Sequence, residues 1–207
     1  MPLLVNGYYM FGKCSYLKTF SGDLSSLTDG RSMFSSCYEL STFSTSNLDS
    51  LVDGDFMFSK CSLSVFSTSL KSLINAQSMF NSNHLLASFS ADISSLRFGA
   101  YMFSNCENLS TFTSPSLKKL LCGYYMFNNC KLNYSSLTHI VNVINDISEL
   151  DKNDASNWKV TNNGVETTLS MEARGAFDVT VSSSVTEAQK NSFVSAMSAK
   201  GWIVNFR

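Results

Sequence analysis

Charge is scarce in this chain of 207 residues. Charged side chains make up 15% of the sequence, the formal net charge is −1, and the lysines and arginines are scattered along it. A chain without a basic patch has no field that attracts nucleic acid or an anionic membrane, so neither is an expected partner. No window approaches the roughly eighteen consecutive apolar residues of a membrane span, and membrane insertion is therefore not expected.

Signatures of catalysis and of metal binding are also missing. The two histidines, His84 and His139, are not accompanied by a Cys or Ser arrangement that would make an activated nucleophile. The sequence has no GxGxxG, Walker, HExxH or CxxC motif. Acidic residues from Asp146 to Asp154 lack the EF-hand pattern and indicate a solvated linker. We expect no enzymatic activity, no catalytic residues, no metal site and no cofactor.

The N-terminal residues contain no recognisable targeting signal. Met1-Pro2-Leu3-Leu4-Val5 is too short for a signal peptide. Tyr8-Tyr9-Met10-Phe11 already belongs to the repeat described next, with no polar capping segment before it. We therefore expect that further N-terminal sequence precedes this segment in the natural protein, and that its location must be inferred by analogy.

What the chain does contain is an internal repeat of about 23 residues. Met-Phe recurs at Met10-Phe11, Met33-Phe34, Met57-Phe58, Met79-Phe80, Met102-Phe103 and Met126-Phe127. A leucine column is spaced by 23 residues at every step: Leu17, Leu40, Leu63, Leu86, Leu109 and Leu132. A phenylalanine column keeps the same spacing: Phe20, Phe43, Phe66, Phe89 and Phe112. Such a unit cannot bury its apolar face alone, so the copies must stack.

Each copy predicts one short strand and a return segment. Leu40 and Phe43 lie three residues apart and a period-2 stretch runs from Thr42 to Thr45, as on the inward side of a leucine-rich-repeat strand. The Leu-x-x-Leu that follows, as in Leu48 and Leu51, has helical or turn spacing. We predict an α/β repeat solenoid of about six repeats over residues 1–134, with parallel strands about 4.8 Å apart.

Five of the six cysteines share one position, four residues after Met: Cys14, Cys37, Cys61, Cys106 and Cys130. The fourth copy has Asn83 there, and Cys122 lies off the column. A spacing near 23 fits no zinc motif. We interpret the column as small, buried, reduced thiols, with disulfides between neighbouring copies as the alternative.

The unit resembles the BspA-like leucine-rich repeats. The residues that carry the resemblance are Met33-Phe34-Ser35-Ser36-Cys37-Tyr38-Glu39-Leu40 and their copies, over about residues 8–134. It departs from that pattern by holding Phe at strand positions that are usually Ile. The resemblance implies a surface or secreted protein that binds host proteins, other cells or matrix, and similar arrays occur in phage-encoded proteins. No named site residue transfers, because such functions depend on variable exposed residues.

Residues 135–207 follow a different pattern, which predicts a helix, a linker and a small β/α cap for the last repeat. An apolar stripe after Ser135-Ser136 predicts a helix over about 136–148, and residues 149–157 form a polar linker. Strands are expected at 158–160, 167–169 and 177–181. Thr186 and Gln189 form a capping box for a second helix that ends near Gly201, before a terminal strand at 202–206.

The candidate binding surface flanks the inward phenylalanines. Nine of the ten outward strand positions carry hydroxyls: Thr19, Ser21, Thr42, Ser44, Ser67, Ser88, Ser90, Thr111 and Thr113. They could bind a glycan or a partner backbone, or they could simply suit a crowded parallel sheet, in which Thr is favoured. Tyr8-Tyr9, Phe56, Tyr101 and Tyr124-Tyr125 precede Met-Phe and could form a recognition edge or belong to the core.

We expect a non-catalytic binding or adhesion module for a protein or glycan ligand, extracellular, on a cell surface or on a virion by resemblance. The alternatives are a structural or receptor-binding segment of a phage virion or a larger surface protein, an ice-binding Ser/Thr array, and an accessory domain of an enzyme. The sequence leaves the oligomeric state open.

Overall fold

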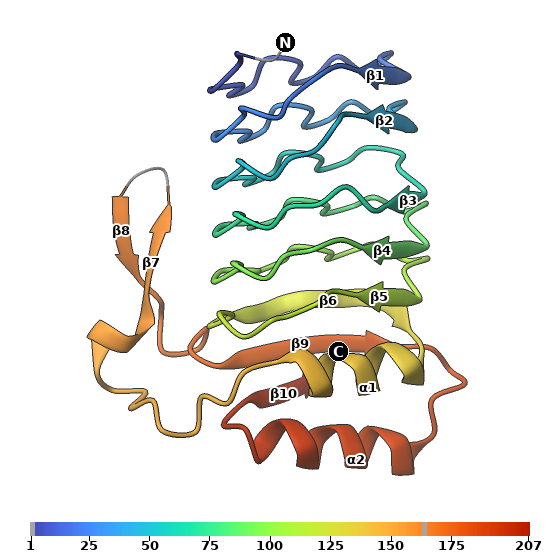
Figure 1. Ribbon diagram of the computed structural model, residues 1–207. Coiled ribbons are helices and arrows are strands. Elements are labelled where there is room, and N and C mark those ends of the chain that lie inside the picture. Colours follow the sequence, from blue (N-terminus) through green and yellow to red (C-terminus); the bar gives the residue numbers. More distant parts are fainter. Residues whose placement is uncertain (1–2, 163–164) are drawn as a thin grey trace.

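The computed structural model describes residues 3–162 and 165–207 and shows a stack of coils closed at one end by helices (Figure 1). One short strand from each of five repeats lies on the same side of the stack: β1 (Thr19–Ser21), β2 (Thr42–Ser44), β3 (Val65–Phe66), β4 (Ser88–Ser90) and β5 (Thr111–Thr113). The strands pair in parallel with partners 23 residues apart, as Phe20 with Phe43 and Phe89 with Phe112. The predicted short parallel strands are present. The Leu-x-x-Leu segments form turns, so the repeats themselves contain no helix among the described residues.

The strands form two sheets, β1-β2 and β3-β4-β5. The third repeat has one residue fewer between Cys61 and Leu63 than the first two repeats have at that point. The ladder breaks at this shortened repeat, between Phe43 and Phe66, whose ring centroids nevertheless remain 6.2 Å apart. The core is therefore continuous where the backbone pairing is not.

Two columns of phenylalanine fill the core. Rings of the Met-Phe column stack almost in parallel, with 5.5 Å between the centroids of Phe34 and Phe58 and an interplanar angle of 1°. Five of the six rings also meet a strand phenylalanine edge-on, as Phe58 meets Phe43 at 4.8 Å, and Phe11 is tilted against Phe20. Parallel-offset and edge-to-face contacts are the favoured geometries of aromatic pairs. Met-Phe thus closes the core of each coil.

The Met-Phe edge of each coil is built from residues with a left-handed backbone. In each of the six repeats the residue before Met and the residue before the Cys position have positive φ. They are Tyr9, Lys13, Ser32, Ser36, Phe56, Lys60, Ser78, Ser82, Tyr101, Asn105, Tyr125 and Asn129. In the first five repeats each of them donates its N–H to a carbonyl of the following coil, as Lys60 does to Asn81 at 2.8 Å. In the sixth repeat the acceptors are side chains of the C-terminal segment. The sequence gives no hint of this conformation, because the residue types have little in common.

The cysteine column has the predicted chemistry. All six cysteines are free thiols, and Cys37, Cys61, Cys106 and Cys130 are buried. Each of these four donates Sγ–H to a phenylalanine carbonyl near 3.2 Å, as Cys61 does to Phe34. Cys14 departs from the prediction because it is exposed. No earlier coil in the described chain covers it.

The C-terminal segment extends the stack. Strand β6 (Gly123–Leu132) pairs in parallel with β9 (Ala176–Val181), which pairs in parallel with β10 (Ile203–Phe206). Helix α1 (Tyr134–Val143) and helix α2 (Glu187–Ser198) lie beside these strands (Figure 1). β6 therefore joins the last repeat and the C-terminal segment in one sheet.

Several C-terminal predictions are confirmed. The Thr186–Gln189 capping box is present, Gly201 has φ +80°, and β9 and β10 lie at the expected places. The first predicted helix is present, but it spans Tyr134–Val143 instead of about 136–148. Asn133 caps it through the N–H of Ser136, and it ends at Val143 because Ile144 is extended and bridges to Leu117.

The predicted linker contains structure. A 3₁₀ helix spans Ala155–Trp158, and Trp158 Nε1 donates to the carbonyl of Asp151 at 2.9 Å. It leads into the antiparallel hairpin of β7 (Lys159–Asn162) and β8 (Val165–Thr168). The expected strands at 158–160 and 167–169 correspond to this hairpin, with shifted bounds.

Candidate functional site

The hydroxyl residues predicted as a binding surface lie together on the strand side of the stack. We call Thr19, Ser21, Thr42, Ser44, Ser67, Ser88, Ser90, Thr111 and Thr113 the hydroxyl face. Seven of them are exposed, and Ser88 and Thr113 are half-buried. Strand register brings like positions together, as Thr19 beside Thr42 and Ser90 beside Thr113. Ser67 directly follows β3, and Val65, 58% exposed, is the one outward strand residue without a hydroxyl.

The hydroxyl face keeps its hydrogen-bonding capacity. Within the described part of the chain, none of its nine side chains makes a hydrogen bond to another protein group. Each Ser or Thr hydroxyl can donate once and accept twice. The strands hold these groups in fixed rows, so a ligand would meet an ordered, uncharged set of donors and acceptors.

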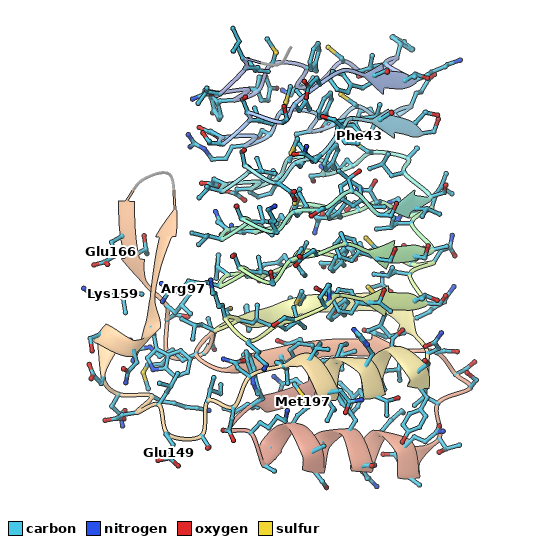
Figure 2. The ribbon with its side chains drawn as sticks, viewed as in Figure 1. Phe43, Arg97, Glu149, Lys159, Glu166 and Met197 are labelled. Atoms are coloured by element: carbon cyan, nitrogen blue, oxygen red, sulfur yellow. The ribbon has the colours of Figure 1, made fainter. Side chains whose placement is uncertain are left out.

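A hollow of about 200 Å³ interrupts the hydroxyl face where the sheet is broken. Thr42, Phe43, Val65 and Ser67 line it. Phe43 is only half-buried, whereas the strand phenylalanines on the other repeats are buried. In Figure 2 Phe43 lies at this level of the stack. The shortened third repeat thus adds an apolar spot to an otherwise polar face.

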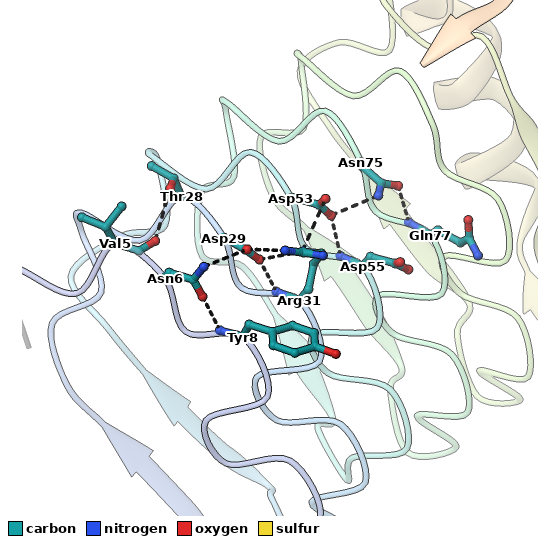
Figure 3. A network of polar contacts seen from close by, with 10 residues as sticks. All are labelled: Val5, Asn6, Tyr8, Thr28, Asp29, Arg31, Asp53, Asp55, Asn75 and Gln77. Atoms are coloured by element: carbon teal, nitrogen blue, oxygen red, sulfur yellow. Dashed lines mark hydrogen bonds and ion pairs between the residues drawn. The ribbon is translucent and has the colours of Figure 1, made fainter. Parts of the chain in front are cut away.

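A polar network follows the turns on another side of the stack (Figure 3). Arg31 pairs with Asp29 at 2.6 Å and approaches Asp53 at 3.8 Å, and Asn75 Nδ2 donates to Asp53 Oδ1 at 3.0 Å. Asp55 lies beside this network. Burial and the neighbouring Asp53 raise the pKa of Asp55 to about 7. These contacts tie successive turns together and offer no open site.

The glycines of these turns are needed for packing. Asp29-Gly30 and Asp53-Gly54 lie in the turns, and neither glycine has positive φ. A Cβ on Gly30 would lie 2.8 Å from Met57 Sδ of the next repeat. Glycine is required there because the methionine of the following coil packs against it.

The aromatic residues that precede Met-Phe have two different settings. Tyr8, Tyr9 and Phe56 are exposed. Tyr101, Tyr124 and Tyr125 instead form a half-buried cluster with ring centroids 4.6 to 5.8 Å apart. The sequence around Tyr101 and Tyr124 does not distinguish a core from a recognition edge, because their burial depends on packing by the C-terminal segment.

The two histidines have different surroundings. His139 Nε2 lies 2.8 Å from the carbonyl oxygen of Ser114 and 3.0 Å from its backbone nitrogen. His84 lies at the surface, 3.4 Å from Glu107. The residues that the structure describes include no His, Cys, Asp and Glu group able to hold a metal ion. Over the same residues, no helix has both the length and the apolarity that a membrane span requires.

Comparison with family models decides the family. The model of the BspA-type leucine-rich repeat region, with six copies, matches residues 6–80 and 74–200. The chain belongs to the BspA-type leucine-rich repeat family. This confirms the resemblance seen on Met33 to Leu40, and the BspA-type match extends beyond residue 134 into the C-terminal segment. No curated protein and no solved structure matches the chain.

Proposed function

We propose that this BspA-type array is a non-catalytic binding module that recognises a protein or glycan partner through its hydroxyl face. The observation that carries the proposal is the set of nine ordered hydroxyls, such as Thr42 and Thr111, that make no hydrogen bond to another group in the described part of the chain. Repeats that stack into an extended surface commonly serve as binding scaffolds and rarely hold a single catalytic pocket. The family, typically a scaffold for protein interaction, supports the same function.

The hydroxyl face favours a polar, uncharged ligand surface. Its rows offer donors and acceptors at the strand spacing, and none of its nine members is charged. The hollow at Phe43 supplies one apolar contact among them. The break between β2 and β3 interrupts the regular spacing that an ice-matched array requires, so the ice-binding alternative is disfavoured.

The test is a charge substitution on the hydroxyl face. Thr42, Ser44, Ser90 and Thr111 are exposed, and changing all four to Lys should abolish binding to any ligand found on glycan and host-protein panels. A matched control carries four Lys residues on the other end of the molecule, at Ser183, Asn191, Ser195 and Ser198, which are also exposed. Equal loss in both variants, or loss in neither, would refute binding at this face.

The second candidate is a structural segment of a larger surface or virion protein. It is favoured by the regular bonding between coils, in which Ser32, Phe56 and Ser78 each donate to the next repeat at 2.8 to 3.0 Å. A stack bonded in this way would make a stiff spacer. Such a spacer tolerates the four-Lys change on the hydroxyl face without loss of function, which distinguishes it from a binding module.

The proposed location is the outside of a cell or a virion. The support is the family, whose repeats are common at cell surfaces. Protease added to intact source cells tests this location. A protein on the outside of the cell should be digested, and a protein that is digested only after lysis would contradict the proposal.

A further inference from the structure

A second concave site lies away from the hydroxyl face, between the repeats and the hairpin of β7 and β8. Figure 1 shows this hairpin standing beside the stack on the side away from β1 to β5. A cavity of about 270 Å³ opens there. Gln77 and Tyr101 from two repeats, Tyr124 from β6, and Thr168 and Ser170 from the end of the hairpin contribute to its lining. The volume lies slightly below the range of ligand pockets, roughly 300–1,000 Å³, and so suits a small ligand.

The aromatic part of the cavity is held rigidly. Tyr101 stacks on Tyr125 with 5.1 Å between centroids and an angle of 12°. Tyr124 stands at 90° to Tyr101 and at 78° to Tyr125. The two tyrosine rings of the lining, Tyr101 and Tyr124, therefore pack against a third tyrosine ring, Tyr125, that is not among the lining residues. A preorganised aromatic surface binds without the cost of ordering its side chains.

A buried carboxylate supports this cluster from beneath. Asp178 on β9 is fully buried, accepts the backbone N–H of Tyr125 at 2.9 Å and pairs with Arg207 at 2.8 Å. The Arg207 guanidinium lies 4.5 Å from the centroid of the Tyr125 ring. The C-terminal segment thus locks Tyr125, and Tyr125 in turn locks Tyr101.

The polar groups of the cavity are free to bind. Within residues 3–162 and 165–207, the hydroxyls of Tyr101, Tyr124, Thr168 and Ser170 and the amide of Gln77 make no side-chain hydrogen bond. Partial burial raises the pKa of Tyr101 and Tyr124, so both phenols stay neutral donors. A small cavity with three aromatic rings, Phe98, Tyr101 and Tyr124, and several unused hydroxyl and amide groups suits a ligand with both apolar faces and many hydroxyls.

The charge around the cavity selects a neutral ligand. None of its described lining residues is charged. An aromatic cluster can also bind a quaternary ammonium group. Here, however, a cation would find no carboxylate among the described lining residues, and Arg207, paired with Asp178, already covers the Tyr125 ring. An anion would find no cationic side chain among the lining residues.

We propose that the cavity between Tyr101, Tyr124 and the β7–β8 hairpin binds a neutral saccharide unit. The C–H face of a pyranose ring packs on a tyrosine ring, and its hydroxyls pair with Gln77, Thr168 and Ser170. This site is separate from the hydroxyl face and does not depend on the function proposed for that face.

The test is ligand-observed NMR on the whole chain with methyl glycosides and short oligomers of glucose, mannose, galactose and N-acetylglucosamine. Sialyllactose, compared with lactose, and tetramethylammonium serve as charged probes. We expect at least one neutral saccharide to bind, with affinity reduced at least tenfold by Tyr124→Ala and by Thr168→Arg. Thr168 is exposed, so its replacement tests the site even if Tyr124→Ala does not fold. Tyr38→Ala, at a tyrosine 54% exposed elsewhere on the stack, should bind as the wild type does.

Several results would overturn the proposal. One is that no neutral saccharide binds at concentrations up to about 10 mM, which is ten times the Kd of a weak ligand, about 1 mM. Another is that tetramethylammonium or sialyllactose binds at the cavity in preference to the neutral sugars. A third is saccharide binding that survives Tyr124→Ala and Thr168→Arg but is lost with four Lys on the hydroxyl face. That outcome refutes the cavity site while supporting the proposed function.

Discussion

The side-chain oxygen of Asn83 accepts the backbone N–H of Leu63 at 3.4 Å. In unshortened repeats this N–H bonds within its own turn, as Leu40 bonds to Cys37 at 2.9 Å. The third repeat lacks one residue there, and the turn cannot supply that bond. Asn83 replaces Cys in the adjacent copy and provides the acceptor, so two departures from the repeat pattern compensate each other.

The first prediction concerns this pair. Asn83 is fully buried, and its Nδ2 also donates to the carbonyls of Phe58 at 2.7 Å and Phe80 at 3.0 Å. Asn83→Cys restores the repeat pattern but leaves the N–H of Leu63 unsatisfied. We expect it to lower the free energy of unfolding by about 1–3 kcal/mol in chemical denaturation. Inserting one residue between Ser62 and Leu63 should remove most of that cost, and a double-mutant cycle without coupling would contradict the account.

Much of the fold could be predicted because the residues concerned act locally. The phenylalanine column places β1 to β5, and Thr186 with Gln189 defines the start of α2. The left-handed positions could not be predicted, because they are imposed by bonds to the next coil and are filled by residues as different as Tyr101 and Lys60.

The hydroxyl face could be located from the sequence because strand residues alternate between inside and outside. The cavity at Tyr124 could not. It needs the β7–β8 hairpin to return beside the repeats, and the sequence gives no register for that contact. The shared sheet of β6 and β9 was missed for the same reason, since its partners, such as Gly123 and Phe177, lie far apart in the chain.

Thiol reactivity should separate Cys14 from the rest of the column. Burial raises the pKa of Cys37 to about 11 and of Cys106 to about 12, and the thiolate is the reactive form. Cys14 alone among the six is exposed. We expect one alkylated cysteine per native chain by mass spectrometry, and none in Cys14→Ser. All six should react in denaturant, and rapid native labelling of Cys106 would refute the burial of the column.

Left-handed positions offer a stabilising substitution. Lys60 is exposed and has φ 59°, a conformation that costs a non-glycine residue about 1–2 kcal/mol. Lys60→Gly removes this cost. It also raises the conformational entropy of the unfolded chain, which offsets part of the gain, so we expect a net stabilisation of about 0.5 kcal/mol. The matched control is Lys118→Gly, at an exposed turn residue without positive φ, which should destabilise. Equal destabilisation of both would argue against strain at Lys60.

Stability should depend on the titration of Asp55. Its folded-state pKa is raised from 3.8 to about 7, so the folded chain retains a proton that the unfolded chain releases. Stability from this group is therefore present at acidic pH and is lost as pH rises from about 4 to about 7. With allowance for its partial exposure, the change should be on the order of 1–2 kcal/mol.

Asp55→Asn tests this assignment. One carboxylate oxygen of Asp55 is buried without a hydrogen-bond partner in the described chain, so removing the charge should stabilise the fold at pH 8 and have little effect at pH 4. Urea denaturation at both pH values measures the difference. Glu172→Gln, at an exposed position, is the control and should show no such dependence. An Asp55→Asn variant with the wild-type pH profile would assign the dependence to another group.

The central claim is that the hydroxyl face contacts the partner, and site-specific photo-crosslinking tests it most directly. A photoreactive side chain is placed at Ser44 or Thr111 on the hydroxyl face, and at Ser195 or Ser198 on α2 as controls. With a partner from the binding panels, the account predicts adducts from Ser44 and Thr111 and none from α2. Adducts from α2 with none from the hydroxyl face would contradict it.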